Sequence, residues 1–546
     1  MSRSTLRIVT IAIVAALALV GLVPVIAEAA TPAPASVVVV PGNKQVTVGW
    51  KAVRNADRYT VQISRSATFA TSRTRTITTT RPVLTATNLA LRTAYWVRVK
   101  AAGGSWSTKV SAVPTTSSPR YKTGVKVAAA GINKVKVTWP RYVAGTSLKV
   151  VASWSNDNVS TVGVRTIAAV NPAKVWITSV PITRTSVTLT VPARWRALMG
   201  STGTEPVYVH LYARNGSKAS HSVTAFGYPS APSLRGSATD AVTFATWNIA
   251  SSTATAGVPG RTWDERKAAV RNGILKAGAA VVAVQEAASS KASGEQYQEL
   301  TRMLSSTYAS AVPLDRLPIT GSQVDAAERR GTAGVSRSDH LLYKPADVTV
   351  LSTGVHSTFA VSGGVAWDRS TFDRDFTWAL MRSKATGARF YVVSTHLERG
   401  TSATVQEMRK AAMSGVRTFI ESKAEAAGLS SAPIVLMGDL NSDSRWTSGP
   451  QVALVQAGYA SATAAQRTVR RSDTTSNSHF ASKDGGFPAK PYHYTYTGTR
   501  IDYIFVKNGG GVSTFVNQMI LTSSGRFDER YRGSDHNLQW ARIRIS

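Results

Sequence analysis

The chain has 546 residues, which is too long for a single hydrophobic core and predicts two to four domains. Hydrophobic residues make up 43% of it and charged residues 17%, a balance that excludes a largely disordered chain. Lysine and arginine total 64 against 30 aspartate and glutamate, so the formal net charge is +34, which predicts anionic partners. The chain contains no cysteine, which excludes disulfides, zinc–thiolate sites and thiol catalysis.

The charge is unevenly distributed along the chain. The residues before 238 include 29 basic and four acidic ones, a net of +25, whereas the rest of the chain carries +9. The N-terminal part therefore holds the strong positive field. The C-terminal part holds nearly all the carboxylates, so metal chemistry is expected there.

The first residues have the pattern of an export signal. Arg3 and Arg7 precede an apolar run over residues 8–26, and Ala-Glu-Ala at 27–29 is a small-x-small cleavage site. We predict a signal peptide over residues 1–29 and a secreted protein, associated with the cell surface as a further option, with no stable membrane insertion after cleavage. Because the apolar run is close to spanning length, an uncleaved anchor is the alternative.

Two β-rich segments follow the signal. Residues 33–117 and 120–231 both alternate short β-rich runs with turns, which predicts two β-sandwiches. The run from Asn88 to Val99 resembles the tyrosine-corner region of fibronectin type III domains, and Trp50 stands where such domains place a core tryptophan. The resemblance implies a fibronectin type III-like first domain. The second segment lacks a clear tyrosine corner.

Residues 238–546 have a different pattern, in which helical segments alternate with buried strands. Residues 262–277 and 402–427 are predicted helices, and residues 280–284 and 433–437 are predicted buried strands. This pattern predicts an α/β domain of about 300 residues.

Six short polar motifs adjoin apolar runs in the α/β domain. They are Thr246-Trp-Asn248, Gln285-Glu286, Thr395-His396, Gly438-Asp439-Leu-Asn441, Ile501-Asp502 and Ser534-Asp535-His536-Asn537. Buried strands end at a sheet edge, where ligand sites collect, so these side chains are expected to converge. Any one of them alone is as well explained by a turn, a cap or a hydrogen-bonded core residue, but six in order on strand ends indicate a site.

The residue types suit one class of reaction. Glu286, Asp439 and Asp535 are hard oxygen ligands that fit Mg²⁺, with Mn²⁺ or Ca²⁺ as alternatives, and the scarcity of histidine argues against zinc. A histidine with a carboxylate partner activates water, while a second histidine and amide groups stabilise charge on phosphoryl oxygens. Metal-assisted hydrolysis of a phosphate ester needs this set of groups.

The six motifs, in this order, resemble the endonuclease/exonuclease/phosphatase family. Its members include DNase I, exonuclease III-type AP endonucleases, neutral sphingomyelinases, deadenylases and inositol polyphosphate 5-phosphatases. The resemblance covers about 240–546. It implies a four-layer α/β sandwich of the DNase I-like type, with two mixed sheets packed face to face and helices outside.

The resemblance also implies a metal site. Asn248 and Glu286 would lie beside the ion, with Glu286 as the main ligand, and Asp535 would support it.

The catalytic roles that the resemblance implies fall on five residues. His396 would hydrogen-bond a phosphate oxygen, and Asp439 with Asn441 would position the attacking water and the phosphate. Asp502 would orient His536, the general base, and Asp439 is the alternative base.

The chain departs from some members of the family. Ala288 stands where DNase I-like enzymes have an arginine, and Ala250 stands where AP endonucleases have an aspartate. DNase I-like enzymes pair a histidine with a glutamate, but that region has Arg337 here, with Asp339 as a possible substitute. The 5-phosphatase tryptophan-cysteine-aspartate-arginine signature is replaced over residues 501–505. AP-site repair and inositide hydrolysis are therefore less favoured among the activities of the family.

Basic and aromatic segments are further candidates for phosphate contact. They are Arg329-Arg330, Arg369–Arg374, Arg467–Arg471 and Lys483–Tyr496, the last with alternating tyrosines that suit either base stacking or a β-hairpin.

We therefore predict a secreted, divalent-metal-dependent phosphodiesterase, and foremost a nuclease acting on DNA or RNA. The basic sandwiches are expected to hold the substrate, or an anionic cell-surface polymer, by non-specific electrostatics. The alternatives are a sphingomyelinase-type phospholipid phosphodiesterase and a non-catalytic surface protein that binds anionic polymers.

Overall fold

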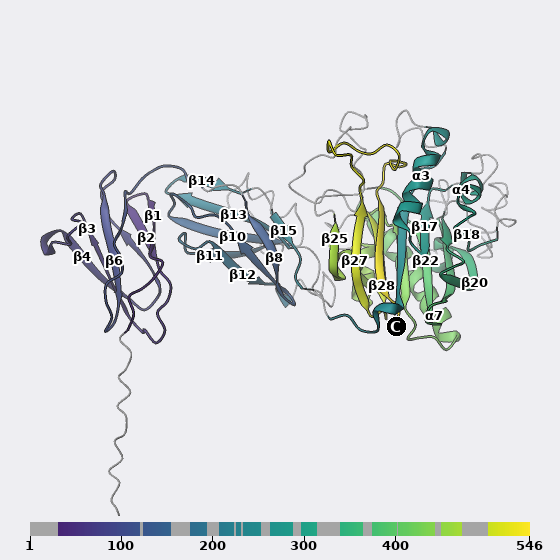
Figure 1. Cartoon of the computed structure of the whole chain (residues 1–546), viewed down its shortest axis with the longest axis horizontal. Coiled ribbons are helices and arrows are strands. Elements are labelled where there is room, and N and C mark those ends of the chain that lie inside the picture. The colour runs from purple at the N-terminus through teal and green to yellow at the C-terminus, as the bar shows by residue number, and fades with distance from the viewer. Residues whose placement is uncertain are drawn as a thin grey trace, which may run out of the picture. The chain divides into compact units, whose positions relative to one another are not determined.

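The structure is a computed structural model of the chain (Figure 1). The residues that it describes are 31–120, 124–153, 175–193, 207–222, 225–230, 233–252, 262–287, 296–313, 339–363, 374–400, 402–442, 449–471 and 501–546. Among these residues, no helix is both long and apolar enough to cross a membrane. The predicted signal peptide, residues 1–29, lies outside them.

The chain divides into two compact units. The smaller contains Val48–Ala86 and Thr93–Ala112 together with the chain up to Val39, and the larger contains Val40–Thr47, Thr87–Arg92 and Val113–Ser546. The predicted domain limits at 33–117, 120–231 and 238–546 stay predictions.

The smaller unit is built on an antiparallel four-stranded sheet. In spatial order its strands are β4 (Thr74–Thr79), β3 (Tyr59–Ser64), β6 (Tyr95–Ala101) and β7 (Val110–Ala112). The 3₁₀ helix η1 (Thr71–Arg73) precedes β4. Trp50 is buried and meets Tyr59 edge to face, with ring centroids 5.2 Å apart, so one side of this sheet faces a core. Strands β1 (Val38–Gly42), β2 (Gln45–Gly49) and β5 (Val83–Thr87) form a three-stranded sheet.

Two more sheets lie between residues 126 and 227. One has the order β11 (Trp176–Val180), β10 (Ser147–Ser153), β13 (Val207–Asn215), β14 (Lys218–His221), and β15 (Ala225–Gly227) also pairs with β13. The other has the order β12 (Ser186–Thr190), β9 (Lys134–Thr138), β8 (Lys126–Gly131). Val137, Leu189, Leu148 and Leu211 share one buried cluster, so both sheets contribute to a common core. The arrangement is sandwich-like, as predicted, and the fibronectin type III identity stays a prediction.

The rest of the larger unit contains two mixed sheets. The seven-stranded sheet has the order β18 (Ala309–Ser310), β19 (His340–Tyr343), β17 (Val281–Gln285), β16 (Ala241–Asn248), β28 (Leu538–Arg544), β27 (Gly511–Gln518), β25 (Gln466–Arg471). The six-stranded sheet has the order β20 (Val348–Ser357), β21 (Asp375–Ser383), β22 (Arg389–His396), β23 (Ile434–Asp439), β26 (Asp502–Lys507), β24 (Ala460–Ser461).

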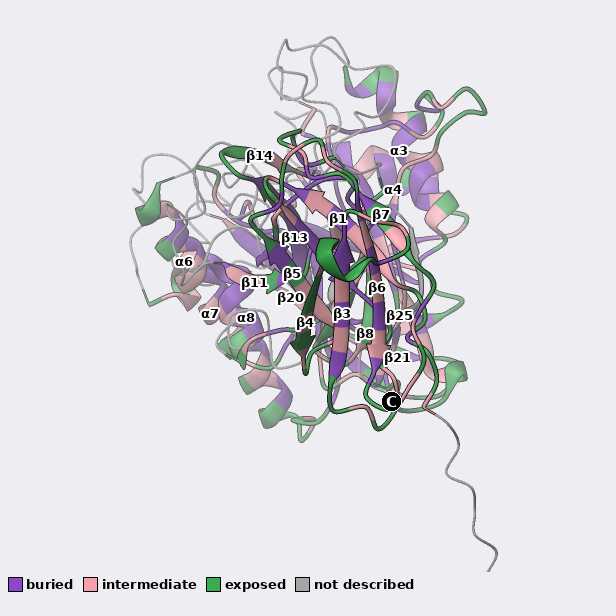
Figure 2. Cartoon of the chain, turned by 90° about the vertical axis from the view of Figure 1, so that its left-hand side faces the viewer, coloured by how far each residue is buried: buried purple, intermediate pink, exposed green. Residues whose placement is uncertain are grey.

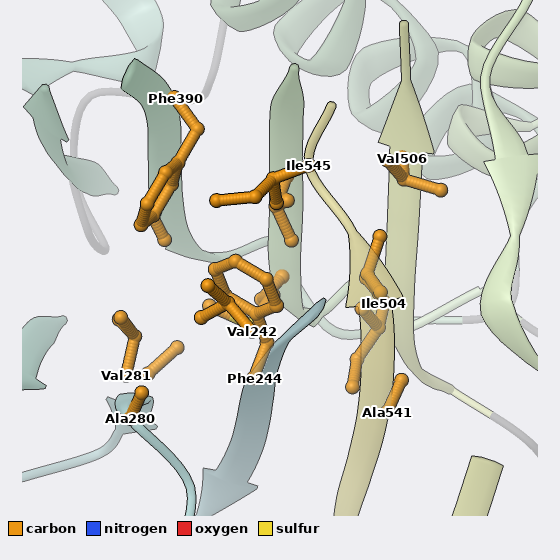
Figure 3. Close-up of a cluster of buried hydrophobic side chains, with 14 of the residues drawn as sticks. Val242, Phe244, Ala280, Val281, Phe390, Ile504, Val506, Ala541 and Ile545 are labelled. Carbon is orange, nitrogen blue, oxygen red and sulfur yellow. The ribbon is translucent and has the colours of Figure 1, made fainter. Parts of the chain in front are cut away.

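The two mixed sheets enclose an apolar core between them. Phe244 of β16 and Phe390 of β22 meet edge to face in this core, with ring centroids 5.5 Å apart, and Ile504 of β26 belongs to the same cluster (Figure 3). Because side chains alternate along a strand, the opposite faces of both sheets need their own cover. Helices supply it, which gives the helix–sheet–sheet–helix order that was predicted.

In the part of the chain that the structure describes, helices cover the outer face of each mixed sheet. Helices α3 (Trp263–Ala277) and α4 (Gln296–Leu304) pack against the seven-stranded sheet, and α7 (Ala403–Ala426) and α8 (Pro450–Gln456) pack against the six-stranded sheet. The short helices α6 (Thr358–Val361) and α9 (Ala462–Ala465) and the 3₁₀ turn η4 (Ala238–Asp240) complete the described elements.

Local sequence signals explain where the main helices begin and end. Thr262 and Glu265 form a reciprocal capping box at the start of α3, and Gly278 ends the helix in a left-handed conformation with φ +62°. Ser402 caps α7 through its side chain. Both predicted helices and both predicted buried strands are therefore confirmed, with ends shifted by one or two residues.

Candidate active site

Strand pairing brings the predicted motifs to one edge of the two sheets. β16 and β17 run parallel, so Asn248 lies beside Gln285, and β22 and β23 run parallel, so His396 lies beside Asp439. β26 runs antiparallel to β23, and its first residue, Asp502, is the register partner of Asp439. The chain enters β28 at the same edge, because β28 is antiparallel to β16.

Hydrogen bonds join the two sheets at this edge. The Asn248 side chain, on the seven-stranded sheet, donates from Nδ2 to Glu286 Oε1 (2.9 Å) and to Asp439 Oδ2 (3.1 Å), which belongs to the six-stranded sheet. Gln285, the register partner of Asn248, makes a second link between the sheets, because its Nε2 donates to Ser394 Oγ (3.1 Å). The site therefore lies where the two sheets meet.

Glu286 is held in an unusual backbone conformation. Its φ of +57° is uncommon for a residue with a side chain, and such conformations cluster at functional sites. The backbone N–H of Ser251 donates to Oε2 (3.0 Å), while Asn248 donates to Oε1. Burial favours the neutral acid, but these hydrogen bonds and the positive charge of His536 outweigh it and lower the pKa of Glu286 to about 2. Glu286 is therefore an ionised carboxylate.

His396 has an arginine as a neighbour. Its Nδ1 accepts a hydrogen bond from Arg374 Nη1 (3.1 Å), and its Nε2 lies 3.5 Å from Asp439 Oδ2. Burial and the positive charge of Arg374 lower the pKa of His396 well below its usual value. His396 is thus a neutral imidazole.

Asp339, the candidate substitute for the histidine-pairing glutamate of DNase I-like enzymes, is fully buried. Burial and the neighbouring Asp375 raise the pKa of Asp339 well above its usual value. The side chain that bonds His396 Nδ1 is Arg374, which belongs to a segment that was predicted to contact phosphate.

The turn after β23 places Asp439 and Asn441. The backbone N–H of Asn441 donates to Asp439 Oδ1 (2.8 Å), and Asn441 adopts a left-handed φ of +47°, which asparagine tolerates better than most residues. Asn441 Nδ2 donates to the carbonyl of Leu397 (2.7 Å) and lies 2.9 Å from His396 Nε2. Burial, reinforced by the charge of Asp502, raises the pKa of Asp439 to about 7.

His536 is oriented by Asp502. Its Nδ1–H donates to Asp502 Oδ2 (2.8 Å), and its Nε2 faces Asp439 Oδ2 at 3.8 Å. Burial favours the neutral ring, but Asp502 and Asp535 outweigh it and raise the pKa of His536 well above its usual value. The backbone is fixed as well, because Trp247 Nε1 donates to the His536 carbonyl (2.9 Å).

Ser534 links the final motif to β16. Its hydroxyl donates to the Asn248 carbonyl (2.6 Å), accepts from the His536 backbone N–H (3.1 Å) and lies 3.2 Å from Asp535 Oδ1. Asp535 is thereby connected to Asn248 through one serine. Burial raises the pKa of Asp535.

The side chains present fit a hard divalent cation. One ligand atom each of Asp439, Asp502 and His536 lies within 4.8 Å of the others, and Glu286 adjoins this group through Asn248. Oxygen atoms dominate the set, as Mg²⁺, Mn²⁺ and Ca²⁺ prefer. Burial raises the pKa of both Asp439 and Asp502, so negative charge here is costly and a cation would relieve it. The assignment of Asn248, Glu286 and Asp535 to the metal stays a prediction.

Sequence reasoning missed two buried arginines that hold the loops of the site. Arg266 of α3 donates to the carbonyls of Ile249, Ala250, Ser251 and Gly533, which flank the Asn248 and Asp535 motifs. Arg409 of α7 donates to the carbonyls of Glu398, Gly400 and Asn441, which flank the His396 and Asp439 motifs.

Both arginines could have been found from their position in the sequence. Each occupies the apolar face of its helix, three and four residues before buried positions: Ala269 and Val270 for Arg266, and Ala412 and Met413 for Arg409. A charged residue on a buried helix face needs partners, since burying a charge without them is costly.

Several predicted positions lie outside the described residues. They are Ala288, Arg329-Arg330, Arg337, residues 369–373, the side chains of 467–471 and Lys483–Tyr496.

Comparison with known proteins gives a family. Among solved structures, the chain resembles an endonuclease/exonuclease/phosphatase from Bacteroides vulgatus (20% identity, covering 56% of this chain and 99% of that one, TM-score 0.40). It also resembles a mannosyl-6-phosphatase from Bacteroides thetaiotaomicron (16% identity, 55% and 99%, TM-score 0.40) and D. rerio TDP2 with a single-strand DNA product (14% identity, 56% and 98%, TM-score 0.35). No curated protein matches the chain. Residues 245–536, more than half of the chain, match the Endonuclease/Exonuclease/phosphatase family profile, so the chain belongs to this family of hydrolases acting on phosphate esters.

Proposed function

We propose that this protein is an exported, divalent-metal-dependent phosphodiesterase that hydrolyses nucleic acid. The observation that carries the proposal is the pairing of His536 with Asp502 at 2.8 Å, with His536 Nε2 facing Asp439 at 3.8 Å. Asp502 orients the His536 ring, and the charged groups around it can move a proton and stabilise a phosphoryl oxygen, as hydrolysis of a phosphate ester needs. It also argues against a domain that only binds.

Glu286, with Asp535 and Asn248 beside it, would hold the metal. A bound divalent cation would neutralise charge on the phosphoryl oxygens and favour the ionised form of a coordinated water. Glu286 is suited to this role because its carboxylate stays ionised, with a pKa of about 2.

The proton of the attacking water would pass to Asp439. Its pKa of about 7 is close to neutral pH, where a general base is most effective. His536 has a raised pKa and is held by Asp502 as an imidazolium, so it would donate from Nε2 to a phosphoryl oxygen. In this proposal Asp439 is the general base and His536 donates a proton, whereas the sequence analysis expected His536 to be the base.

His396 and Asn441 would bind the phosphate from the other side. His396 is a neutral ring between Arg374 and Asn441, so it contributes hydrogen bonding without charge. The Asn441 backbone N–H fixes Asp439 Oδ1, which leaves Oδ2 to face both histidines.

Nucleic acid is the substrate that the charge favours. The residues before 238 have a net charge of +25, and a long polyanion would be held there by counterion release. A phospholipid substrate would instead call for exposed apolar loops. Export rests on the signal pattern of residues 1–29.

The test is a substrate panel with purified protein. Single-stranded DNA, double-stranded DNA, RNA, sphingomyelin vesicles and a phosphomonoester are incubated with Mg²⁺, with and without excess chelator. We expect metal-dependent cleavage of nucleic acid, and none by Glu286→Gln. Release of phosphocholine from sphingomyelin with intact nucleic acid would overturn the substrate, and release of phosphate from the monoester alone would overturn the phosphodiesterase assignment.

A further inference from the structure

The smaller unit presents cations and aromatic rings together on one face of its four-stranded sheet. Along β6 the residues alternate, so that Tyr95, Val97 and Val99 are buried and Trp96, Arg98 and Lys100 are half-buried on the other side. Strands β3, β4 and β6 lie side by side in Figure 2, with buried and less buried positions alternating along β3 and β6. The second side of this sheet therefore faces away from the core.

Four close cation–ring contacts order this face. The Arg98 guanidinium lies 4.2 Å from the Phe69 ring centroid and 4.5 Å from that of Trp106. Lys100 Nζ lies 5.1 Å from the Trp106 centroid, and Lys109 Nζ lies 5.2 Å from that of Trp96. These six residues, Phe69, Trp96, Arg98, Lys100, Trp106 and Lys109, are called the cation–ring face below.

The contacts fix the cations before any ligand arrives. Arg98 Nε also donates to Gln62 Oε1 (2.8 Å), so its guanidinium has one orientation. Ordering a long side chain on binding costs about 0.5–1.5 kcal/mol, and a side chain that is already ordered avoids most of that cost.

The charge of the face is not balanced by acids within its own segment. Residues 33–117, all of which the structure describes, contain 12 lysine and arginine residues and one acid, Asp57. Exposed cation–ring contacts stabilise a fold by only about 0.5–1 kcal/mol each. Repulsion among so many like charges works against the fold, so stability alone does not account for them.

We propose that the cation–ring face binds single-stranded nucleic acid, a partner that rests on the proposed function. A single strand offers phosphates to the cations and base planes to the aromatic rings, and proteins that bind it combine these two features. A phosphate polymer without bases would contact the cations but would have no planar group to stack on Trp96 and Trp106. The surface thus gives the substrate a second contact, remote in sequence from Glu286 and His536.

The test measures binding by the full-length protein carrying Glu286→Gln, which prevents cleavage. Fluorescence anisotropy with a labelled single-stranded oligonucleotide is recorded over a range of salt concentrations. In this background Arg98→Gln, Lys100→Gln and Lys109→Gln are combined. The matched control combines Lys51→Gln, Arg54→Gln and Arg81→Gln, three exposed cations of the same segment.

We expect the face variant to bind more weakly with a shallower salt dependence. Each phosphate contact on a single strand contributes about 0.7 to the slope of log K against log salt, so three contacts predict a loss of about 2. The control should keep most of the slope. A slope equal to the parent's in the face variant, with thermal unfolding unchanged, would overturn the proposal.

The rings are tested separately. Trp106→Leu should weaken oligonucleotide binding severalfold without changing the slope, and should leave binding of a base-free polyphosphate unchanged. If the parent and Trp106→Leu bind the oligonucleotide equally well, and bind the polyphosphate equally well, the ligand of the face is any polyanion and not nucleic acid in particular. Arg98 packs on Phe69, so replacing it could disturb the fold. The double variant Lys100→Gln, Lys109→Gln therefore repeats the salt-dependence measurement with Arg98 kept.

A separate readout distinguishes this proposal from the proposed function. With Glu286 intact, the face variant should hydrolyse a dinucleotide at the parent rate, since its single phosphodiester is taken up by the active site. If the parent hydrolyses no nucleic acid but the oligonucleotide still binds through the cation–ring face, the proposed function fails and the surface survives.

Discussion

Asp439 and Asp502 are register partners on adjacent antiparallel strands, so two buried carboxylates stand side by side at the centre of the site. Burial raises the pKa of both, and the charge of Asp502 raises that of Asp439 further, to about 7. Such a pair is stabilised by a cation, by a proton or by the imidazolium of His536. We therefore expect the site to respond both to metal and to pH.

Removing divalent metal should abolish hydrolysis. Without it, Glu286, Asp439 and Asp535 present negative charge to a negatively charged phosphate. Initial rates in excess chelator and over a Mg²⁺ titration check this. Glu286→Gln should lose most activity at every Mg²⁺ concentration with an unchanged circular dichroism spectrum, whereas the exposed control Glu425→Gln should behave as the parent. Full activity in excess chelator would exclude the metal mechanism.

Asp502→Asn should shift the pH profile of turnover in a direction that identifies the role of His536. Asp502 raises the pKa of His536, so the substitution lowers it. If charged His536 donates to the phosphate, activity is lost as the pH rises through that pKa, and the basic limb moves to lower pH. Turnover at neutral pH should also fall by about 10² to 10⁴-fold, the usual contribution of such a group.

If His536 is instead the general base, the change should appear in the acid limb of the pH profile. If His536 is the base, activity is lost as the pH falls through its pKa, and Asp502→Asn moves the acid limb to lower pH while the basic limb stays. A profile of kcat at saturating metal separates the two outcomes. His536→Ala with normal turnover would exclude both and leave Asp439 to act alone.

Arg409→Lys should lower turnover more than it lowers stability. The guanidinium reaches three carbonyls that flank the His396 and Asp439 motifs, and the single ammonium of lysine cannot span them. We expect a drop in kcat of at least tenfold and a modest fall in Tm. Arg409→Met should cost more stability, about 1–3 kcal/mol for each carbonyl left without a donor. Arg417→Lys, on the same helix and paired only with Glu421 and Thr418 in the contacts described, is the control.

Gly438→Ala should disrupt the junction between β22 and β23. A Cβ at this position would overlap the carbonyl oxygen of Thr395, and the φ of +148° already disfavours a side chain. The expected loss exceeds about 3 kcal/mol, measured by denaturant unfolding. Gly428→Ala is the matched control, because it also has a positive φ (+66°) but open space around a Cβ, so it should cost only about 1–2 kcal/mol. Equal losses in the two variants would contradict this account.

The convergence of the site was predictable because it depends on strand order and direction. Asn248, Glu286, His396 and Asp439 each come at the end of a buried strand, and parallel strands end at one edge. Helix α3 was predictable for a local reason, the capping box of Thr262 and Glu265 followed by Gly278.

What could not be predicted depends on contacts between segments remote in sequence. The Arg374–His396 contact was not predicted, because nothing in the local sequence shows which side chain reaches Nδ1. The left-handed backbone of Glu286 goes with hydrogen bonds that its carboxylate accepts from Asn248 and Ser251, which are remote in sequence. Arg266 and Arg409 stand out on the buried faces of their helices, but the carbonyl oxygens that they reach carry no sequence signature.

The pairing of β28 with β16 has a consequence for the order in which the protein becomes active. Trp247 Nε1 bonds the carbonyl of His536, 289 residues further along the chain, and Ser534 bonds the carbonyl of Asn248. A chain growing on a ribosome can form most of both sheets before His536 exists, since domains fold as they are synthesised from the N-terminus. Until β28 pairs with β16, such a chain lacks the Ser534–His536 segment at its candidate site. An unfinished chain would therefore lack both His536 and the contacts that hold Trp247 and Asn248 at this edge.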